Sequence, residues 1–279
     1  MTRTPKRFVN GLRKLSCSAD FCRIFGDVFF MTEEVKQRLK ELAGKYENSA
    51  FLQSDPSQFL RWYKNQADVE IASFVAAMLS FGNRKQFIPK IRFIFETADK
   101  TGGIFLWIKS GAFEKDFCSF LGDDDEKFYR FYSYDEMKNL FRAFKILLEK
   151  YGTFGEYIKI FDSGKNPAGA ISAAFENCKI VPKGKNSANK RVNMFLRWMV
   201  RQDSPVDLGL WNWISPADLI IPLDTHVIQE AGKLGLIPEN SPASMRTAQK
   251  ITAALKEVWP CDPCKGDFAL FGLGVDEDK

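Results

Sequence analysis

The sequence has a single histidine and no long hydrophobic run. Because His226 is the only imidazole among 279 residues, a metal centre built from several histidines is excluded. No stretch reaches the roughly eighteen apolar residues that a membrane span needs, so we expect no membrane partner. Residues 1–30 are basic but lack both an apolar core and a small-residue cleavage site. This excludes a typical export signal and favours a cytoplasmic protein.

Cysteines and nucleotide-binding motifs are also sparse. Of the six cysteines, Cys261 and Cys264 form the one Cys-x-x-Cys pair, which supplies only half of a zinc site. A thioredoxin-like use of that pair requires a βαβ setting that the sequence does not predict. No glycine-rich phosphate loop of the nucleotide enzymes occurs. We therefore expect reduced thiols, no bound metal and no cofactor.

The patterns that are present predict an all-α protein of about ten helices. No segment shows sustained alternation or a hairpin turn, whereas apolar residues recur with helical spacing, as in residues 134–152. Residues 68–82 are almost all apolar, which is typical of a helix buried on most sides, and Gly82 would end it. Thr32 and Asp55 are predicted helix caps.

The domain organisation follows from the first of these helices. A capped helical pattern begins beside Met31, so we interpret residues 1–30 as an extension and Met31 as the natural start. Residues 31–279 are long enough for one helical domain of two lobes that share a core. We expect this domain to be a monomer.

Two basic segments that contain no acidic residue indicate a polyanionic partner. In residues 181–201 the polar positions Lys190, Asn193, Arg197 and Arg201 share one helical stripe, opposite a buried apolar face. A solvated surface is the alternative interpretation, but such a helix usually interleaves acids with its bases. Loop amides that lead into a basic helix N-terminus suit a phosphate, so DNA, or else RNA, is the predicted partner. The second basic segment is residues 79–95. The predicted nucleic-acid contacts are nine polar residues of the two segments: Arg84, Lys85, Lys183, Lys185, Ser187, Asn189, Arg191, Arg197 and Arg201.

The only histidine lies in the segment "PLDTHV", where Asp224 precedes a helical pattern. Asp224 is a predicted N-cap, and an aspartate fixed by backbone amides stays ionised and rigidly aimed. We therefore expect a residue that is both a cap and part of a site. For His226 a hydrogen-bonded packing role is favoured over acid–base chemistry.

The segments "KRVNMFLRWMV" and "PLDTHV" together resemble the core of the helix-hairpin-helix DNA glycosylase superfamily, which contains endonuclease III. The segments "VAAMLSFGNRKQ" and "KGDFALFGLGV" extend the resemblance over roughly residues 68–275. The whole is most similar to a bacterial branch of that superfamily that is classed as a domain of unknown function. The resemblance implies a two-lobed helical fold that removes damaged bases from DNA. It also implies a catalytic lysine at Lys190 and a catalytic aspartate at Asp224.

One departure keeps an alternative open. Where the superfamily carries a Gly-x-Gly hairpin, this sequence has Asn186, Ser187, Ala188 and Asn189 before Lys190. The departure favours a non-catalytic nucleic-acid-binding protein that keeps the glycosylase fold. Modification of RNA is a third hypothesis.

The implied chemistry requires a neutral lysine amine. A lysine with an unperturbed pKa of about 10.4 is neutral in only about one copy in 2,500 at pH 7, so burial must lower that pKa. Asp224 opposes this, unless its main task is to stabilise positive charge that develops on the sugar. An extruded base also needs flat neighbours. Trp211 and Trp213, with His226, are the predicted base pocket, and packing in the core is the alternative for both tryptophans.

Both nucleic-acid hypotheses predict that affinity depends strongly on salt. Six or more phosphate contacts would lower the affinity for duplex DNA by about a thousandfold or more between 50 and 200 mM salt. Fluorescence anisotropy of a labelled duplex measures this slope. An affinity that stays constant over that range excludes nucleic acid as the partner.

Overall fold

The computed structural model describes residues 31–277, except residues 54, 163–165 and 185–186. The predicted extension, residues 1–30, therefore lies outside the described residues, as does the predicted contact Lys185. The described residues belong to one compact unit that begins at Met31.

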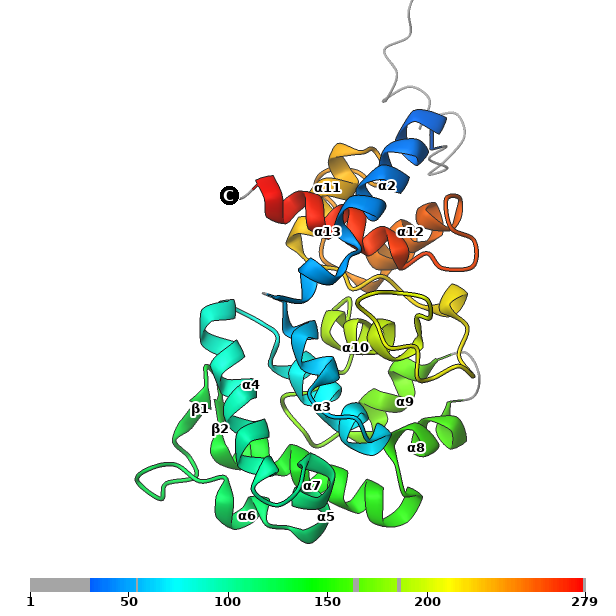
Figure 1. The fold of residues 1–279 in the computed structure, drawn as a ribbon. Coiled ribbons are helices and arrows are strands. Elements are labelled where there is room, and N and C mark those ends of the chain that lie inside the picture. The colour runs from blue at the N-terminus through cyan, green and yellow to red at the C-terminus, as the bar shows by residue number, and fades with distance from the viewer. Residues whose placement is uncertain (1–30, 54, 163–165, 185–186, 278–279) are drawn as a thin grey trace, which may run out of the picture. The chain divides into compact units, whose positions relative to one another are not determined.

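The described chain is mostly helical, which confirms the predicted class (Figure 1). Within the described residues, no helix combines the length and apolar character that crossing a membrane requires. The sequence did not predict one antiparallel hairpin, made by β1 (Lys127–Tyr129) and β2 (Tyr132–Ser133). Strands this short carry too few residues to show alternation.

The larger of two hydrophobic clusters surrounds α3 (Gln66–Leu79), in which every residue from Ala67 onward is buried. Phe74 of α3 lies at its centre, and its ring packs at centroid distances of 4.8 to 5.5 Å against four other phenylalanines. Such pairs contribute about 0.5–1.5 kcal/mol each beyond the area they bury. The remaining elements around this cluster are the strand β1 and the helices η2 (Pro56–Arg61), α4 (Arg84–Asp99), α5 (Ile104–Ser110), α6 (Phe113–Asp116), α7 (Tyr134–Tyr151), α8 (Phe154–Phe161), α9 (Pro167–Ala174) and α10 (Lys190–Val200).

The smaller cluster lies among four helices: α2 (Glu33–Tyr46), α11 (Thr225–Lys233), α12 (Met245–Lys256) and α13 (Lys265–Glu277). Two glycines let α13 approach its neighbours closely. A Cβ at Gly272 would lie 2.3 Å from Cγ of Tyr46 on α2, and one at Gly274 would lie 2.8 Å from Cβ of His226 on α11. The short helices η1 (Ser49–Gln53) and η3 (Pro216–Asp218) belong to connecting segments.

A network of buried ion pairs joins α10 to the smaller cluster. Its members, which we call the arginine network, are Arg197, Arg201, Glu47, Asp207, Asp262 and Asp267. The Arg201 guanidinium donates to Glu47 at 2.8 Å, to Asp262 at 2.8 Å and also to Asp207, while Arg197 bridges Asp207 and Asp267. The network links α10 with the end of α2 and the start of α13.

The network overturns one prediction. Arg197 and Arg201 were expected on an exposed, nucleic-acid-binding stripe, but only 5% and 2% of their surfaces are exposed. Asn193, on the same stripe, is also buried and donates to the Ala188 carbonyl at 2.9 Å. Asp207 lies only a few positions beyond the basic segment, and Glu47, Asp262 and Asp267 come from distant parts of the chain. The lack of acids within the segment therefore did not indicate exposure.

Removing one member of the network should destabilise the fold strongly. We expect Arg201→Ala to lower the free energy of unfolding by about 3–5 kcal/mol, because it leaves buried carboxylates without their cation. Lys179→Ala is the matched control, since Lys179 is exposed and pairs with Glu136 at 2.7 Å. It should change stability by less than about 1 kcal/mol. Urea unfolding measures both, and equal losses would contradict the assignment.

Candidate functional site

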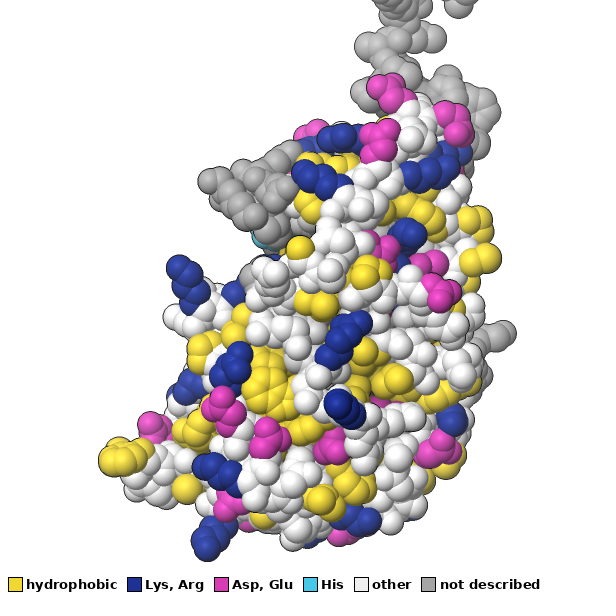
Figure 2. Space-filling model, in the orientation of Figure 1, with side chains coloured by type: hydrophobic (Ala, Val, Ile, Leu, Met, Phe, Trp, Pro, Cys, Tyr) yellow, Lys and Arg dark blue, Asp and Glu magenta, His cyan; other side chains and the backbone are white. Residues whose placement is uncertain are grey.

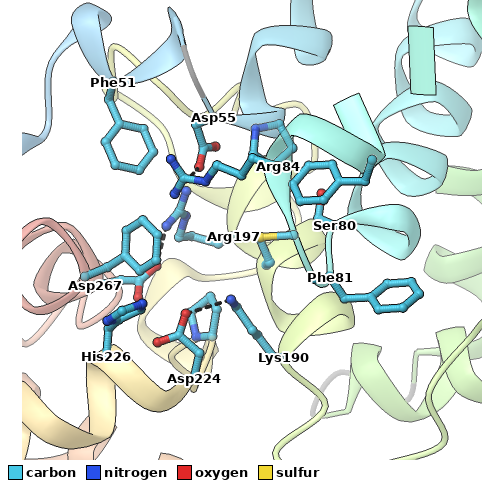
Figure 3. Close-up of a pocket in the computed structure, with 16 residues that line it drawn as sticks. Phe51, Asp55, Ser80, Phe81, Arg84, Lys190, Arg197, Asp224, His226 and Asp267 are labelled. Atoms are coloured by element: carbon cyan, nitrogen blue, oxygen red, sulfur yellow. Dashed lines mark hydrogen bonds and ion pairs between the residues drawn. The ribbon is translucent and has the colours of Figure 1, made fainter. Parts of the chain in front are cut away.

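A cavity of about 360 Å³ opens where α10, α11 and α13 meet the loop between α3 and α4 (Figure 3). Its volume falls within the range of about 300–1,000 Å³ that is usual for small-molecule sites. The aromatic residues in its wall are Phe51, Phe81, Phe87 and Phe271. The ionisable ones are Asp55, Arg84, Lys190, Arg197, Asp224, His226 and Asp267.

Lys190 and Asp224, the two predicted catalytic residues, meet in this cavity. The Lys190 ammonium donates to Oδ2 of Asp224 at 2.7 Å, although 34 positions separate them in the chain. The side chains are 35% and 15% exposed, so the pair is accessible from the cavity without being fully solvated.

Local structure fixes both ends of this pair. Lys190 is the first residue of α10, and Asn189 before it adopts a left-handed backbone, with φ 53° and ψ 37°. Asp224 is the N-cap of α11, and its Oδ1 accepts a hydrogen bond from the Val227 amide at 3.0 Å. The two oxygens of Asp224 are thus divided between the helix cap and the lysine, so the predicted cap is present.

A second ion pair, between Asp267 and Arg197, also lines the cavity. Asp267 of α13 is buried and accepts from Arg197, as the dashed line in Figure 3 marks. The pKa of the Asp267 carboxyl is raised to about 6: burial is the main cause and the nearby Asp224 carboxylate adds to it, while Arg197 and Lys190 oppose the shift. This carboxyl therefore titrates close to neutral pH.

An aromatic wall stands beside these charges. Phe271 lies one helical turn after Asp267 on α13. Its ring centre is 5.8 Å from the Lys190 ammonium and 5.6 Å from the Arg84 guanidinium, which allows both cations to interact with the ring face. Arg84 also faces the Asp55 carboxylate at 3.8 Å. A flat ligand in the cavity would meet one ring and two cations.

Two more of the predicted phosphate contacts are used within the protein. The half-buried Lys183 ammonium donates to the carbonyls of Phe175 and Cys178, and burial lowers its pKa. The Arg191 guanidinium donates to the Met78 carbonyl. The prediction that Lys183 contacts a phosphate is wrong, because its ammonium is bonded to two carbonyls in the turn after α9.

The other predicted contacts differ in their exposure. Lys85 and Ser187 are exposed, whereas Asn189 is buried, and its Oδ1 has no hydrogen-bond partner among the described residues. Figure 2 shows that Lys and Arg side chains are interspersed with Asp and Glu on the face in view. That face carries no continuous basic stripe.

The predicted base pocket is wrong for both tryptophans. Trp211 is fully buried in the larger cluster and donates to Glu70 at 2.9 Å, and the Trp213 ring packs on it at 5.6 Å. Neither lines the cavity. His226, the third member, does line it, and its ring packs edge-on against Phe271 at 6.1 Å.

Asp267 and Phe271 line the cavity but were not predicted as site residues. Both belong to "KGDFALFGLGV", which the resemblance placed only behind the site. The two residues are four positions apart, which places an acid and an aromatic ring on the same face of the helix. This spacing could have identified them from the sequence. Asp55 was predicted as a cap and is one, since it accepts from the Ser57 amide at 3.0 Å, but it also lines the cavity.

Within the described part of the chain, no group of three or more histidine, cysteine, aspartate or glutamate side chains is placed to hold a metal. Of the Cys-x-x-Cys pair, Cys261 is exposed and Cys264 is buried. Burial raises the pKa of the Cys264 thiol, which makes it a poor nucleophile.

Residues 55–276 match a family model described as "Protein of unknown function (DUF2400)". The chain belongs to this family. The DUF2400 match includes every residue that lines the cavity except Phe51. Comparison with curated proteins and with solved structures gives no match. The family description carries no activity, so a function has to be argued from the site.

The double role of Asp224 can be separated by two substitutions. Asp224→Asn keeps a good capping group, so we expect a change of less than about 1 kcal/mol in the free energy of unfolding. Asp224→Ala loses the cap and should cost about 1–2 kcal/mol. Ser244→Ala, which removes the cap of α12, gives the reference for cap loss. Equal effects of the two Asp224 variants would show that the cap is not the source of the loss.

Proposed function

We propose that this protein is a DNA glycosylase of the helix-hairpin-helix type, in which Lys190 is the nucleophile and Asp224 stabilises charge on the sugar. The observation that carries the proposal is the 2.7 Å contact between these side chains in the wall of a cavity. A glycosylase needs such a cavity to hold the extruded base.

The proposed reaction begins with loss of a proton from the Lys190 ammonium to solvent, while Asp224 beside it stays ionised. The free amine attacks the sugar carbon that carries the damaged base, and a nitrogen–carbon bond forms. The glycosidic bond breaks, and the base leaves with the bonding electron pair and takes up a proton. Opening of the sugar ring then gives a Schiff base, which water hydrolyses.

Asp224 suits its proposed role. Because the Val227 amide holds one of its oxygens, the carboxylate needs no rearrangement when positive charge develops on the sugar. Carboxylates that are fixed in advance stabilise a transition state better than mobile ones do.

The aromatic wall supports the choice of a base as the ligand. In this proposal Phe271, rather than Trp211 or Trp213, stacks on the extruded base. Arg84 and Lys85 at the start of α4 and Ser187 before α10 are the proposed phosphate contacts. The proposed protein acts as a cytoplasmic monomer without a cofactor, and RNA is the alternative nucleic acid.

A non-catalytic nucleic-acid-binding protein of the same fold is the second candidate. It is favoured by the same ion pair, because an ammonium held by a carboxylate is not a nucleophile until it loses a proton. In that case Lys190 and Asp224 would only join α10 to α11.

Borohydride trapping distinguishes the two. With a duplex that contains an abasic site, we expect a covalent adduct for the unaltered protein and none for Lys190→Ala, because reduction fixes the Schiff base on that amine. Lys85→Ala is the matched control: it removes a nearby exposed cation and should keep the adduct at saturating protein. No adduct with the unaltered protein favours the binding protein.

The proposed role of Asp224 predicts that its substitution slows base release but not adduct formation at an abasic site. For Asp224→Asn we expect release of an oxidised purine from a duplex to slow by about 10²- to 10³-fold, as loss of one charge-stabilising group does elsewhere. The adduct with a preformed abasic site should persist, since that step needs no departing base. Equal loss of both activities would contradict this division of roles.

A further inference from the structure

The tip of the β1–β2 hairpin is fixed on the loop that lines the cavity. The Tyr129 hydroxyl donates to the Phe81 carbonyl. Gly82 has φ +80°, and a Cβ there would lie 2.2 Å from Nη1 of Arg130. Only a glycine with a left-handed backbone allows this contact. Hairpin and loop therefore form one unit at the rim of the cavity.

Two aromatic rings and two arginines meet on this unit. The rings of Phe81 and Phe131 are 10° from parallel, with centroids 6.5 Å apart. The Arg130 guanidinium lies 5.7 Å and 5.3 Å from these two ring centres, and Arg191 lies 4.9 Å from that of Phe81. We call Phe81, Arg130, Phe131 and Arg191 the rim cluster.

The rim cluster is poorly explained by packing alone. Phe131 is 66% exposed, so its ring gains little from burial. Neither Arg130 nor Arg191 forms an ion pair with a carboxylate among the described residues, in contrast to the arginine network. Arg191 already donates to the Met78 carbonyl, whereas Arg130 is exposed. An exposed flat ring beside an exposed guanidinium that has no carboxylate partner among the described residues is the chemistry that stacks on a nucleobase and attracts its phosphate.

The cluster also extends beyond the cavity, because Phe81 is the one member of the cluster that lines it. In Figure 3 the Phe81 side chain points away from the Lys190–Asp224 pair. Phe81 thus connects the cavity wall to the other members of the rim cluster. A strand that places one base in the cavity would bring a neighbouring or facing base to the rim.

We propose that the rim cluster is a stacking site for an unpaired nucleobase beside the position whose base enters the cavity. That the stacked base lies beside a position whose own base has left the helix rests on the proposed function. Stacking on the rim cluster itself requires no catalysis. The alternative, a protein that docks on Phe131, fits less well, because the exposed Arg130 guanidinium beside that ring favours a polyanion.

The test compares two duplexes that differ at one position. One carries a tetrahydrofuran residue, which has no base and no reactive aldehyde, and the other is fully paired. All proteins also carry Lys190→Ala, so catalysis cannot contribute. We expect tighter binding to the tetrahydrofuran duplex, and a fall in this preference of about 5- to 100-fold in Phe131→Ala.

Further variants separate stacking from apolar contact. Phe131→Trp should keep the preference, and Phe131→Leu should lose it, because leucine has no ring face. Phe120→Ala is the matched control, since Phe120 is fully exposed and lies outside the rim cluster. It should leave the preference unchanged. Thermal melting should show the same stability for every variant, as expected for exposed positions.

The outcomes separate this inference from the proposed function. If the borohydride adduct forms but Phe131→Ala keeps the preference, the rim cluster is not a stacking site and the enzyme proposal stands. If no adduct forms but the preference depends on the ring, the protein binds nucleic acid through the rim without catalysis. Absence of any duplex binding overturns both.

Discussion

The position of α10 depends on the arginine network at its C-terminal half. Arg197 and Arg201 lie seven and eleven positions after Lys190, so all three side chains leave the helix on nearly the same face. Because the two arginines must reach carboxylates on α13 and at the end of α2, the rotation of α10 about its axis is fixed. The same rotation points Lys190 at Asp224 on α11. The geometry of the Lys190–Asp224 ion pair is thus set by the buried contacts of the arginine network.

This arrangement explains which predictions the sequence allowed. Features that depend on neighbours in the chain were predicted: the helical class, the caps at Thr32 and Asp55, and the helix start at Asp224. The periodicity of the stripe on α10 was also right. Its environment was not, because Glu47 lies 154 positions from Arg201 and Asp267 lies 70 from Arg197. Local charge composition carries no information about partners that distant.

The site follows the same rule. Lys190 and Asp224 were predicted because a resemblance spans both segments, not because their spacing required a contact. Trp211 was assigned to a base pocket because it precedes Asp224, but its partner Glu70 lies on the central buried helix. Phe271 and Asp267 reach the cavity because α13 packs closely on α11 and α2, and this close packing depends on Gly274 and Gly272, whose role is visible only in three dimensions.

The close packing of α2 on α13 has a consequence for where the folded unit begins. The family match starts at residue 55 and so leaves out α2 and Glu47, although it includes nearly the whole cavity. A fragment that begins at residue 55 would lack Leu39 and Leu42, and would therefore expose the apolar surface of α13 that they cover. Asp267 and Phe271 lie on this helix. The truncation would also remove one carboxylate from Arg201. The smallest autonomous piece of this protein therefore extends past the homology boundary, to the start of the helix at residue 33.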